Sequence, residues 1–154
     1  MMIEEFKSQD AETLPIGKLI SIIARNYTFY FNHHLEEFGI NASQLHFLFE
    51  IHSQKEINQE KIASRCNINK GAVARSIKKL EDNGLIIRKI DANNRRQNIV
   101  SLTQEGERTL ELARKKLDKW EEYVLNDNIV EKEVLQELLK EIIIKSIEFN
   151  QRES

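Results

Sequence analysis

Apolar residues recur at helical spacing over two long stretches near the ends of the chain. The first set comprises Ile16, Leu19, Ile20, Ile23, Tyr27, Tyr30, Phe31, Leu35 and Phe38. Positions three or four apart form one face of an α-helix. Pro15 suits a first helical turn, where a missing N–H costs nothing, and Gly39 is a natural stop. The pattern therefore predicts one long helix over 16–38.

Three asparagines mark the starts of shorter helices in the middle of the chain. Asn41, Asn58 and Asn69 each precede a stretch with helical spacing, and an amide oxygen is a good acceptor for the free N–H groups of a first turn. Gln44 completes a capping box with Asn41, and Gly84 ends the third of these helices. We predict helices over 41–52, 58–66 and 69–83.

Two short β-branched segments, 85–90 and 99–102, predict strands. The residues between them, 91–97, include asparagines and arginines, which tolerate turn geometry. The two segments therefore form an antiparallel hairpin. A basic helix followed at once by a cationic hairpin is the layout of a winged helix-turn-helix that reads DNA.

The C-terminal part of the chain predicts two more helices. Thr103 is placed to cap the first, and Asn126-Asp127-Asn128 ends it. Its apolar face holds Leu110, Ala113, Leu117, Trp120 and Val124. The last helix carries Val134, Leu135, Leu138, Leu139, Ile142, Ile143 and Ile147. The predicted fold class is mainly α, with six helices and a small two- or three-stranded antiparallel β-wing.

Charge is unevenly distributed along the chain. The formal net charge is −2, but residues 59–98 hold ten basic and four acidic side chains, so this window carries +6 and the remainder −8. Attraction to a polyanion depends on the local patch of charge and not on the whole-chain balance. The middle of the chain is therefore suited to bind nucleic acid.

The bulk composition bounds the class of protein. A length of 154 residues suits one domain, residues 1–154, and the chain lacks a run of about 18 apolar residues that would predict a membrane span. Residues 1–10 include four charged side chains, so they lack the apolar core of a signal peptide. A single cysteine fits a reducing compartment. We expect a cytoplasmic protein without a membrane partner.

The apolar stripes at the two ends exceed what the small basic middle can cover. Packing against a second copy of the chain is their simplest fate. We expect 12–38 and 104–150 to form a helical dimerisation lobe, and 40–103 to form the winged-helix lobe. A two-fold dimer presents two recognition helices about one DNA turn apart, roughly 34 Å, which fits a pseudo-palindromic site on double-stranded DNA.

Two runs of residues resemble one protein family. The first is Lys70-Gly71-x-Val73-x-Arg75-x-Ile77-x-x-Leu80-Glu81-x-x-Gly84-Leu85-Ile86-x-Arg88. The second is Asp91-x-x-Asn94-Arg95-Arg96-x-x-x-Val100-x-Leu102-Thr103-x-x-Gly106. In these runs and in the order of its helices, the chain resembles the MarR family of transcriptional regulators. The resemblance implies a homodimeric, ligand-responsive repressor. We also expect no enzymatic activity, no cofactor and no metal.

Two positions depart from the family pattern. The family often has Asp before the paired hairpin arginines, where this chain has Asn94. An asparagine still braces a turn. The last helix of the family usually opens with Thr or Ser, where Val130 stands here, so Asn128 is the alternative cap.

The resemblance implies that one helix and the hairpin contact DNA. The expected residues are Gln59, Ser64, Asn69, Lys70, Gly71, Ala72, Ala74, Arg75, Lys78, Asn93, Asn94, Arg95 and Arg96. From its chemistry alone, Arg75 has the planar fork that recognises a guanine edge. A solvated surface is the alternative for Lys70 and Lys78, but the cationic hairpin downstream favours DNA contact.

The two hairpin arginines are expected to differ in role. One of them enters the minor groove in the family, where a narrow A·T tract concentrates negative potential. Arg96 matches that inserted residue better than Arg95. We expect the other arginine to pair with Asp91 and brace the turn.

Members of the family commonly respond to small aromatic anions. Lys18 and Arg25 lie seven residues apart and share a helix face, and His46 is a third candidate beside Tyr27. We expect these residues to bind a salicylate-like compound. Ordinary surface ion pairs are the alternative for Lys18 and Arg25.

Other classes of function have weaker support in the residues. The four histidines lack metal-ligand spacing. Cys66 has the spacing of an inward-facing residue, which favours a buried side chain over a redox sensor. The chain shows no convergent nucleophile, base and phosphate loop of an enzyme. A winged-helix module that binds protein has little need of Arg95 and Arg96.

Overall fold

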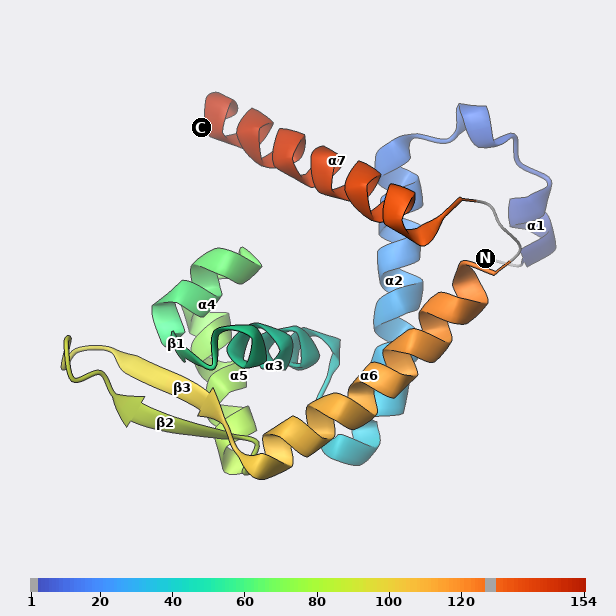
Figure 1. Ribbon diagram of the computed structural model, residues 1–154. Helices are drawn as coiled ribbons and strands as arrows, with labels where there is room; N and C mark the ends of the chain where they lie inside the picture. Colours follow the sequence, from blue (N-terminus) through green and yellow to red (C-terminus); the bar gives the residue numbers. More distant parts are fainter. Residues whose placement is uncertain (1–2, 127–129) are drawn as a thin grey trace. The chain divides into compact units, whose positions relative to one another are not determined.

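The computed structural model describes residues 3–126 and 130–154, and the chain divides into two compact units, one ending at Arg114 and one running from Lys115 to Ser154. The α-helices are α1 (Ile3–Lys7), α2 (Ile16–Leu35), α3 (Ala42–Gln54), α4 (Gln59–Cys66), α5 (Lys70–Asp82), α6 (Gln104–Val124) and α7 (Lys132–Glu153). The strands are β1 (Glu56–Asn58), β2 (Ile86–Ile90) and β3 (Asn98–Leu102). Figure 1 shows these elements in chain order.

The six predicted helices are present, and α1 is an additional single turn. None of its residues is buried, and it contains an ion pair between Lys7 and Glu4 at 2.9 Å. A single turn of five residues is too short for hydrophobic spacing to indicate, and its apolar side chains Ile3 and Phe6 are not buried. Two 3-10 turns, η1 (Ala11–Thr13) and η2 (Glu36–Phe38), flank α2, and Gly39 takes the left-handed conformation after η2, with φ at 67°.

The three asparagine caps are confirmed. Asn41 Oδ1 accepts from the Gln44 N–H at 2.9 Å, and Gln44 Oε1 accepts from the Asn41 N–H at 3.1 Å, which completes the capping box of α3. Asn58 accepts from the Glu60 N–H, and Asn69 from the Ala72 N–H, each at 2.8 Å. Each cap satisfies a donor that the first helical turn leaves free.

The core of the first unit is built around α3. Its largest fully buried side chains are Phe31, Leu35, Leu45, Phe47, Leu48, Ile51, Ile62, Val73, Ile77, Leu80, Val100 and Leu110. Of the long α2 helix, only Phe31 and Leu35 are buried. Ile16 and Ile23, earlier in that helix, are 64% and 59% exposed. The predicted apolar face of α2 therefore remains uncovered over most of its length within one chain.

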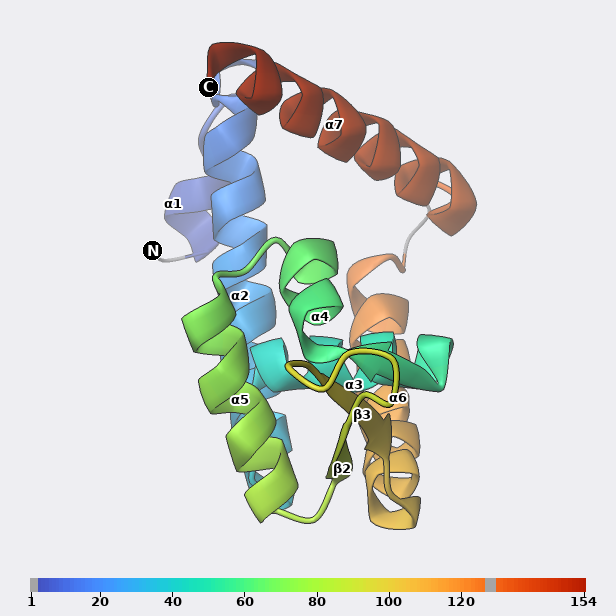
Figure 2. The ribbon, with the colours of Figure 1, turned by 90° about the vertical axis from the view of Figure 1, so that its left-hand side faces the viewer.

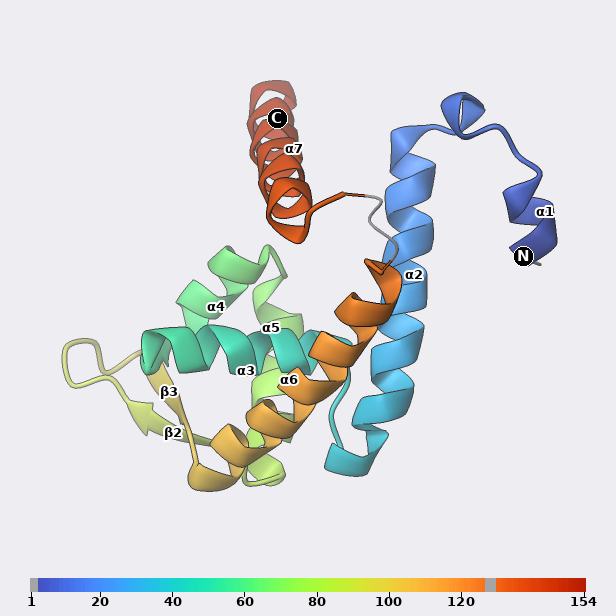
Figure 3. The same ribbon diagram turned by 45° about the vertical axis from the view of Figure 1, so that its right-hand side comes forward.

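The sheet has three antiparallel strands in the order β1-β3-β2. β1 pairs with β3 from Glu56↔Ser101 to Asn58↔Ile99, and β2 pairs with β3 from Ile86↔Leu102 to Ile90↔Asn98. The third strand that the sequence left open is thus β1. Figures 1 and 3 show the β2–β3 hairpin projecting from the helices of this unit.

A backbone joint connects the end of α5, the sheet and the start of α6. The Leu85 N–H donates to the Leu80 carbonyl at 3.0 Å, and the Thr103 N–H donates to the Leu85 carbonyl at 3.0 Å. Thr103 Oγ1 caps α6 by accepting from the Gly106 N–H at 2.9 Å, as predicted. Gly106 is buried, and a Cβ built on it would lie 2.0 Å from the Leu85 carbonyl oxygen. A residue without a side chain is needed for this close approach.

The second unit contains the end of α6 and all of α7. None of its described residues is buried, and apolar side chains line α7, including Leu138 at 54% and Ile142 at 45% exposure. Asp127, expected among the residues that end α6, and Asn128, expected as the cap of α7, lie outside the described residues. Glu131 occupies the position before α7 and makes no side-chain cap. Among the described helices, none is long and apolar enough to cross a membrane.

Candidate nucleic-acid interface

One face of α5 is covered by the core and the opposite face is open. Val73, Ile77 and Leu80 are buried, as their spacing predicted. At about 100° per residue, Gly71 and Arg75 lie on the opposite side of the helix. Ala72 and Ala74 are half-buried between the two faces. In Figure 2, α5 and the hairpin turn lie on the side of the first unit that faces the viewer.

Arg75 is the central cation of this open face. It is exposed and forms no ion pair with a described residue. Its Nη1 atom lies 3.7 Å from the position that a Cβ of Gly71 would occupy, so the guanidinium folds back over the first turn of α5. Helical side chains point toward the N-terminus in this way. The absence of a side chain at Gly71 leaves the guanidinium accessible beside the helix N-terminus, which favours anions.

The basic residues of 59–98 divide into paired and unpaired sets. The paired ones are Lys70 with Glu60 at 3.6 Å, Lys78 with Asp82 at 3.2 Å, Arg88 with Glu81 at 2.6 Å, and Arg65 with Glu50. Within the described part of the chain, no ion pair engages Lys61, Arg75, Lys79, Lys89, Arg95 or Arg96. The six unpaired residues therefore carry the positive charge of 59–98 that no described acidic side chain offsets within an ion pair.

The hairpin turn is held by its own backbone. The Asp91 N–H donates to the Gln97 carbonyl at 2.9 Å, and the Asn94 N–H donates to the Asp91 carbonyl at 3.2 Å. Asn94 Oδ1 accepts from the Arg96 N–H at 3.2 Å, so the asparagine braces the turn as expected. Arg95 and Arg96 are both exposed. These bonds fix the turn while they leave the two guanidinium groups projecting.

The prediction that Asp91 forms an ion pair with a hairpin arginine is wrong. Asp91 Oδ1 instead accepts from the Asn93 N–H at 2.8 Å. Neither Arg95 nor Arg96 is within ion-pair distance of an acidic residue that the structure describes. Asp91 therefore braces the turn through the backbone, since the nearest donor within reach of its short side chain is the N–H two residues on.

Hydrogen bonds of the Gln97 side chain link the turn to the start of α4. Gln97 Nε2 donates to Glu60 Oε2 at 3.3 Å, and Asn58 Nδ2 donates to Gln97 Oε1. The sequence indicates Gln97 only as part of a turn and Glu60 only as one of four acids among the basic residues of 59–98. The contact spans 37 residues of sequence, so no local pattern indicates it.

Gln59 and Ser64, expected at the DNA backbone, differ in exposure. Ser64 is exposed and lines a hollow of about 350 Å³ with Lys61, Arg65 and Asn58. Gln59 is half-buried, and its Oε1 atom is covered and has no hydrogen-bond partner among the described residues. Ser64 is therefore the better placed of the two to meet a phosphate.

The structure does not bring the three expected effector residues together. The His46 ring stacks on Tyr27, with centroids 5.9 Å apart and planes at 14°. Arg25 and Lys18 precede Tyr27 by two and nine positions, which places them about 200° and about 180° around α2 from it. Burial lowers the pKa of His46, which disfavours the charged imidazolium that an anion would need. Arg25 instead lines a hollow of about 370 Å³ beside Phe29.

The metal and redox alternatives find no support in the described residues. No group of three or more His, Cys, Asp or Glu side chains is arranged there to hold a metal. Cys66 is half-buried, and burial raises the pKa of its thiol, with the Glu50 carboxylate adding to the effect. A raised thiol pKa disfavours the thiolate that a redox sensor needs.

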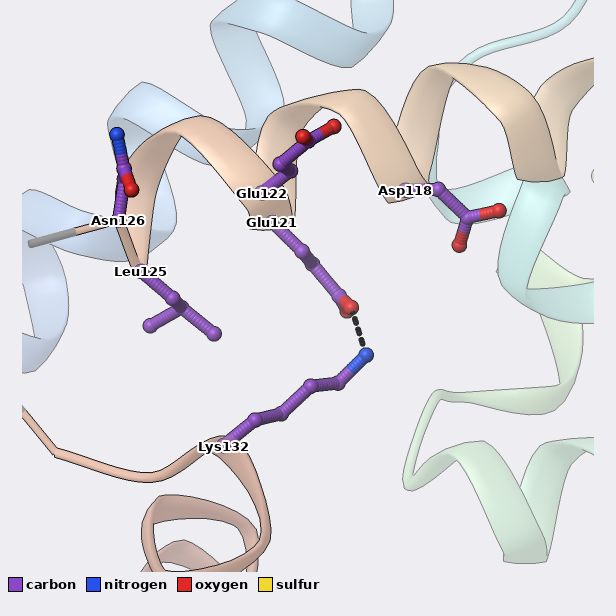
Figure 4. A pocket seen from close by; sticks show the side chains of 6 residues that line it. All are labelled: Asp118, Glu121, Glu122, Leu125, Asn126 and Lys132. Carbon is purple, nitrogen blue, oxygen red and sulfur yellow. Dashed lines mark hydrogen bonds and ion pairs between the residues drawn. The ribbon is translucent and has the colours of Figure 1, made fainter. Parts of the chain in front are cut away.

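A separate hollow of about 310 Å³ in the second unit is largely acidic (Figure 4). Its lining includes Asp118, Glu121, Glu122 and Lys132. Lys132 donates to Glu121 at 2.5 Å, and this hydrogen bond raises the pKa of Lys132. The carboxylates of this hollow repel a phosphate backbone, so the hollow is not part of the candidate interface.

The geometry of the first unit thus defines a winged helix-turn-helix. The MarR family model matches residues 40–97, which include α3, α4, α5 and the hairpin turn. A curated relative, the uncharacterized HTH-type transcriptional regulator YwoH of Bacillus subtilis strain 168, is 35% identical over 96 residues, 62% of this chain and 69% of the relative.

Solved structures agree with the family assignment. A crystal structure of MarR matches with a TM-score of 0.83 and 26% identity, over 94% of this chain and 99% of that one. A mutant MarR from E. coli complexed with operator DNA matches with a TM-score of 0.72 and 25% identity, over 87% of this chain and 99% of that one. This chain belongs to the MarR family. It is a DNA-binding transcriptional regulator and not an enzyme.

Proposed function

We propose that this protein is a homodimeric repressor that binds a pseudo-palindromic operator through α5 and the hairpin. The observation that carries the proposal is the set of unpaired cations on both elements, Arg75 on α5 and Arg95 and Arg96 on the hairpin. A similar fold has been solved with operator DNA. Arg75 would read a base edge in the major groove, and a hairpin arginine would enter the minor groove.

Because the Asp91 pairing is absent, both hairpin arginines are available to DNA. The turn is closed by backbone bonds, so neither guanidinium is needed to hold it. We infer that Arg95 and Arg96 act together, one in the minor groove and the other on the phosphates beside it. Lys78 would exchange its carboxylate partner for a phosphate, at small cost because such an exposed ion pair is weak, and Lys70 would contact a phosphate while it stays beside Glu60.

Dimerisation is proposed from the apolar faces of α2 and α7. Each helix exposes large aliphatic side chains along its length. Monomeric proteins rarely expose contiguous apolar patches larger than a few hundred Å². A second copy would bury these faces and present two α5 helices to successive turns of DNA.

The test of DNA reading is a comparison of Arg75→Ala with Lys79→Ala. Each variant removes one unpaired positive charge from α5. We expect Arg75→Ala to weaken binding to a duplex from the protein's own promoter about tenfold, and binding to a scrambled duplex much less. Lys79→Ala should weaken both duplexes alike, because a phosphate contact carries no sequence information. Titrations at several salt concentrations measure both effects.

If Arg75→Ala lowers the affinity for the promoter duplex and for the scrambled duplex equally, this residue does not read a base. Failure of the unmodified protein to prefer its promoter at physiological salt would contradict the operator proposal altogether. A winged helix that binds only protein would give that second result.

A small aromatic acid is the proposed effector, acting by favouring a dimer whose recognition helices are wrongly spaced for DNA. Arg25 beside Phe29 supplies a cation and an aromatic face in one hollow. We expect millimolar salicylate to lower operator affinity several-fold, and Arg25→Ala to abolish that response. Lys119→Ala, an equal charge change at an exposed position of α6, is the control. Unchanged operator affinity with salicylate would remove this ligand class.

A further inference from the structure

Three side chains close a ring of hydrogen bonds where the hairpin meets α4. Asn58 Oδ1 accepts from the Glu60 N–H at 2.8 Å, and Asn58 Nδ2 donates to Gln97 Oε1. Gln97 Nε2 completes the ring by donating to Glu60 Oε2 at 3.3 Å. Both polar atoms of the Gln97 amide are therefore engaged, which fixes the orientation of this side chain at the end of the turn.

The same carboxylate reaches the recognition helix. Lys70 Nζ, at the first position of α5, lies 3.6 Å from Glu60 Oε2. One oxygen atom thus contacts the hairpin through Gln97 and α5 through Lys70. These are the two elements that carry the unpaired arginines.

The hairpin turn has little other support. The ladder between β1 and β3 ends at the Asn58↔Ile99 pair, and that between β2 and β3 ends at Ile90↔Asn98. Beyond these pairs, the hydrogen bonds of Asp91, Asn93 and Asn94 stay within the turn. In the described structure, Gln97 is the turn residue that bonds to an element outside the hairpin.

We propose that Glu60 is a positioning residue for DNA recognition, which holds the hairpin arginines in register with the open face of α5. The proposal rests on the proposed DNA-reading function and goes beyond it by assigning a role to an acidic side chain. An acid beside a phosphate-binding surface lowers affinity by simple repulsion. Its benefit is geometric: it fixes the distance between the major-groove and minor-groove contacts before DNA arrives.

The test is a double-mutant cycle between Glu60 and the hairpin arginines. In the unmodified chain, the double change Arg95→Ala with Arg96→Ala should weaken operator binding about tenfold, as expected for loss of charge-assisted contacts. In a Glu60→Ala background the same double change should cost only about twofold, because a misplaced hairpin has little contact to lose. In a Glu60→Gln background the cost should return to about tenfold, since an amide oxygen still accepts from Gln97.

The cycle compares ratios within each background, so a general change in charge or stability cancels. Glu105→Ala is the matched control, because Glu105 is an exposed acid whose partner is Arg108 on its own helix. The full tenfold cost is expected in that background. If the double arginine change weakens operator binding about tenfold in the Glu60→Ala background as well, the proposal is overturned.

A second measurement separates this proposal from the proposed function. Amide hydrogen exchange of Asp91 and Gln97, whose N–H groups close the turn, should speed up several-fold in free Glu60→Ala and stay unchanged in Glu105→Ala. Equal exchange rates in Glu60→Ala and the unmodified chain would overturn the proposal that Glu60 holds the hairpin turn in place. If the unmodified protein fails to bind operator while hydrogen exchange responds as expected, the proposed DNA-reading function is wrong but Glu60 still holds the hairpin turn.

Discussion

Replacing Gly106 by alanine should destabilise the fold by about 3 kcal/mol, the upper part of the range for inserting a methyl group into a packed site. The new Cβ would lie 2.0 Å from the Leu85 carbonyl oxygen and 3.0 Å from its carbon. That carbonyl cannot swing away freely, because it accepts from the Thr103 N–H at 3.0 Å. The higher helix propensity of alanine, worth about 1 kcal/mol, only partly offsets the clash.

Thermal unfolding at fixed protein concentration checks this result. For a chain of this size we expect the Tm to fall by about 6–12 °C. Gly71→Ala is the matched control, since its Cβ would meet Asn69 Oδ1 at 3.5 Å and Arg75 Nη1 at 3.7 Å, which are ordinary contacts. That control should leave the Tm unchanged or slightly raised. A Gly106→Ala protein as stable as the unmodified chain would contradict the close approach of α6 to the hairpin root.

Replacing Ile142 by aspartate should raise the dissociation constant of the proposed dimer about 100-fold or more. Ile142 is 45% exposed in the single chain, so the change leaves the fold of one chain intact. In a dimer that buries the apolar face of α7, an unpaired carboxylate would lose its water without gaining a partner. That cost is several kcal/mol, or the protonated acid forms instead.

Sedimentation equilibrium measures the expected shift from dimer to monomer. Gln136→Asp, on the same helix and about 120° around it from Ile142, makes the same change in charge and serves as the control. We expect it to remain dimeric. A chain that is monomeric without any substitution, or an Ile142→Asp variant that stays fully dimeric, would rule out α7 as the pairing surface.

Local patterns in the sequence predicted the elements with sharp ends. Asn41, Asn58, Asn69 and Thr103 each offer an acceptor to a first helical turn, and all four caps are confirmed. Such bonds span only two or three residues, so sequence spacing alone specifies them. The buried face of α5 was predicted for the same reason, since its spacing repeats within one element.

Contacts between distant residues account for what the sequence did not indicate. β1 is three residues long and has no alternating pattern of its own, because its strand character comes from pairing with β3. The bonds of Gln97 to Asn58 and Glu60 are invisible to any short-range pattern. Lys18 and Arg25 share one face of α2 by their spacing, but His46 meets the face that carries Tyr27, and which face it meets depends on tertiary packing that no local pattern shows.

The joint at Leu85 has a consequence for how this regulator would be switched. The Leu85 N–H donates to Leu80 in the last turn of α5, the Leu85 carbonyl accepts from Thr103 just before α6, and Thr103 Oγ1 donates to the Gly84 carbonyl at 2.6 Å. The start of α6 is therefore hydrogen-bonded directly to the chain that follows α5. A tilt of the start of α6 would move the end of α5 and the root of the hairpin with it.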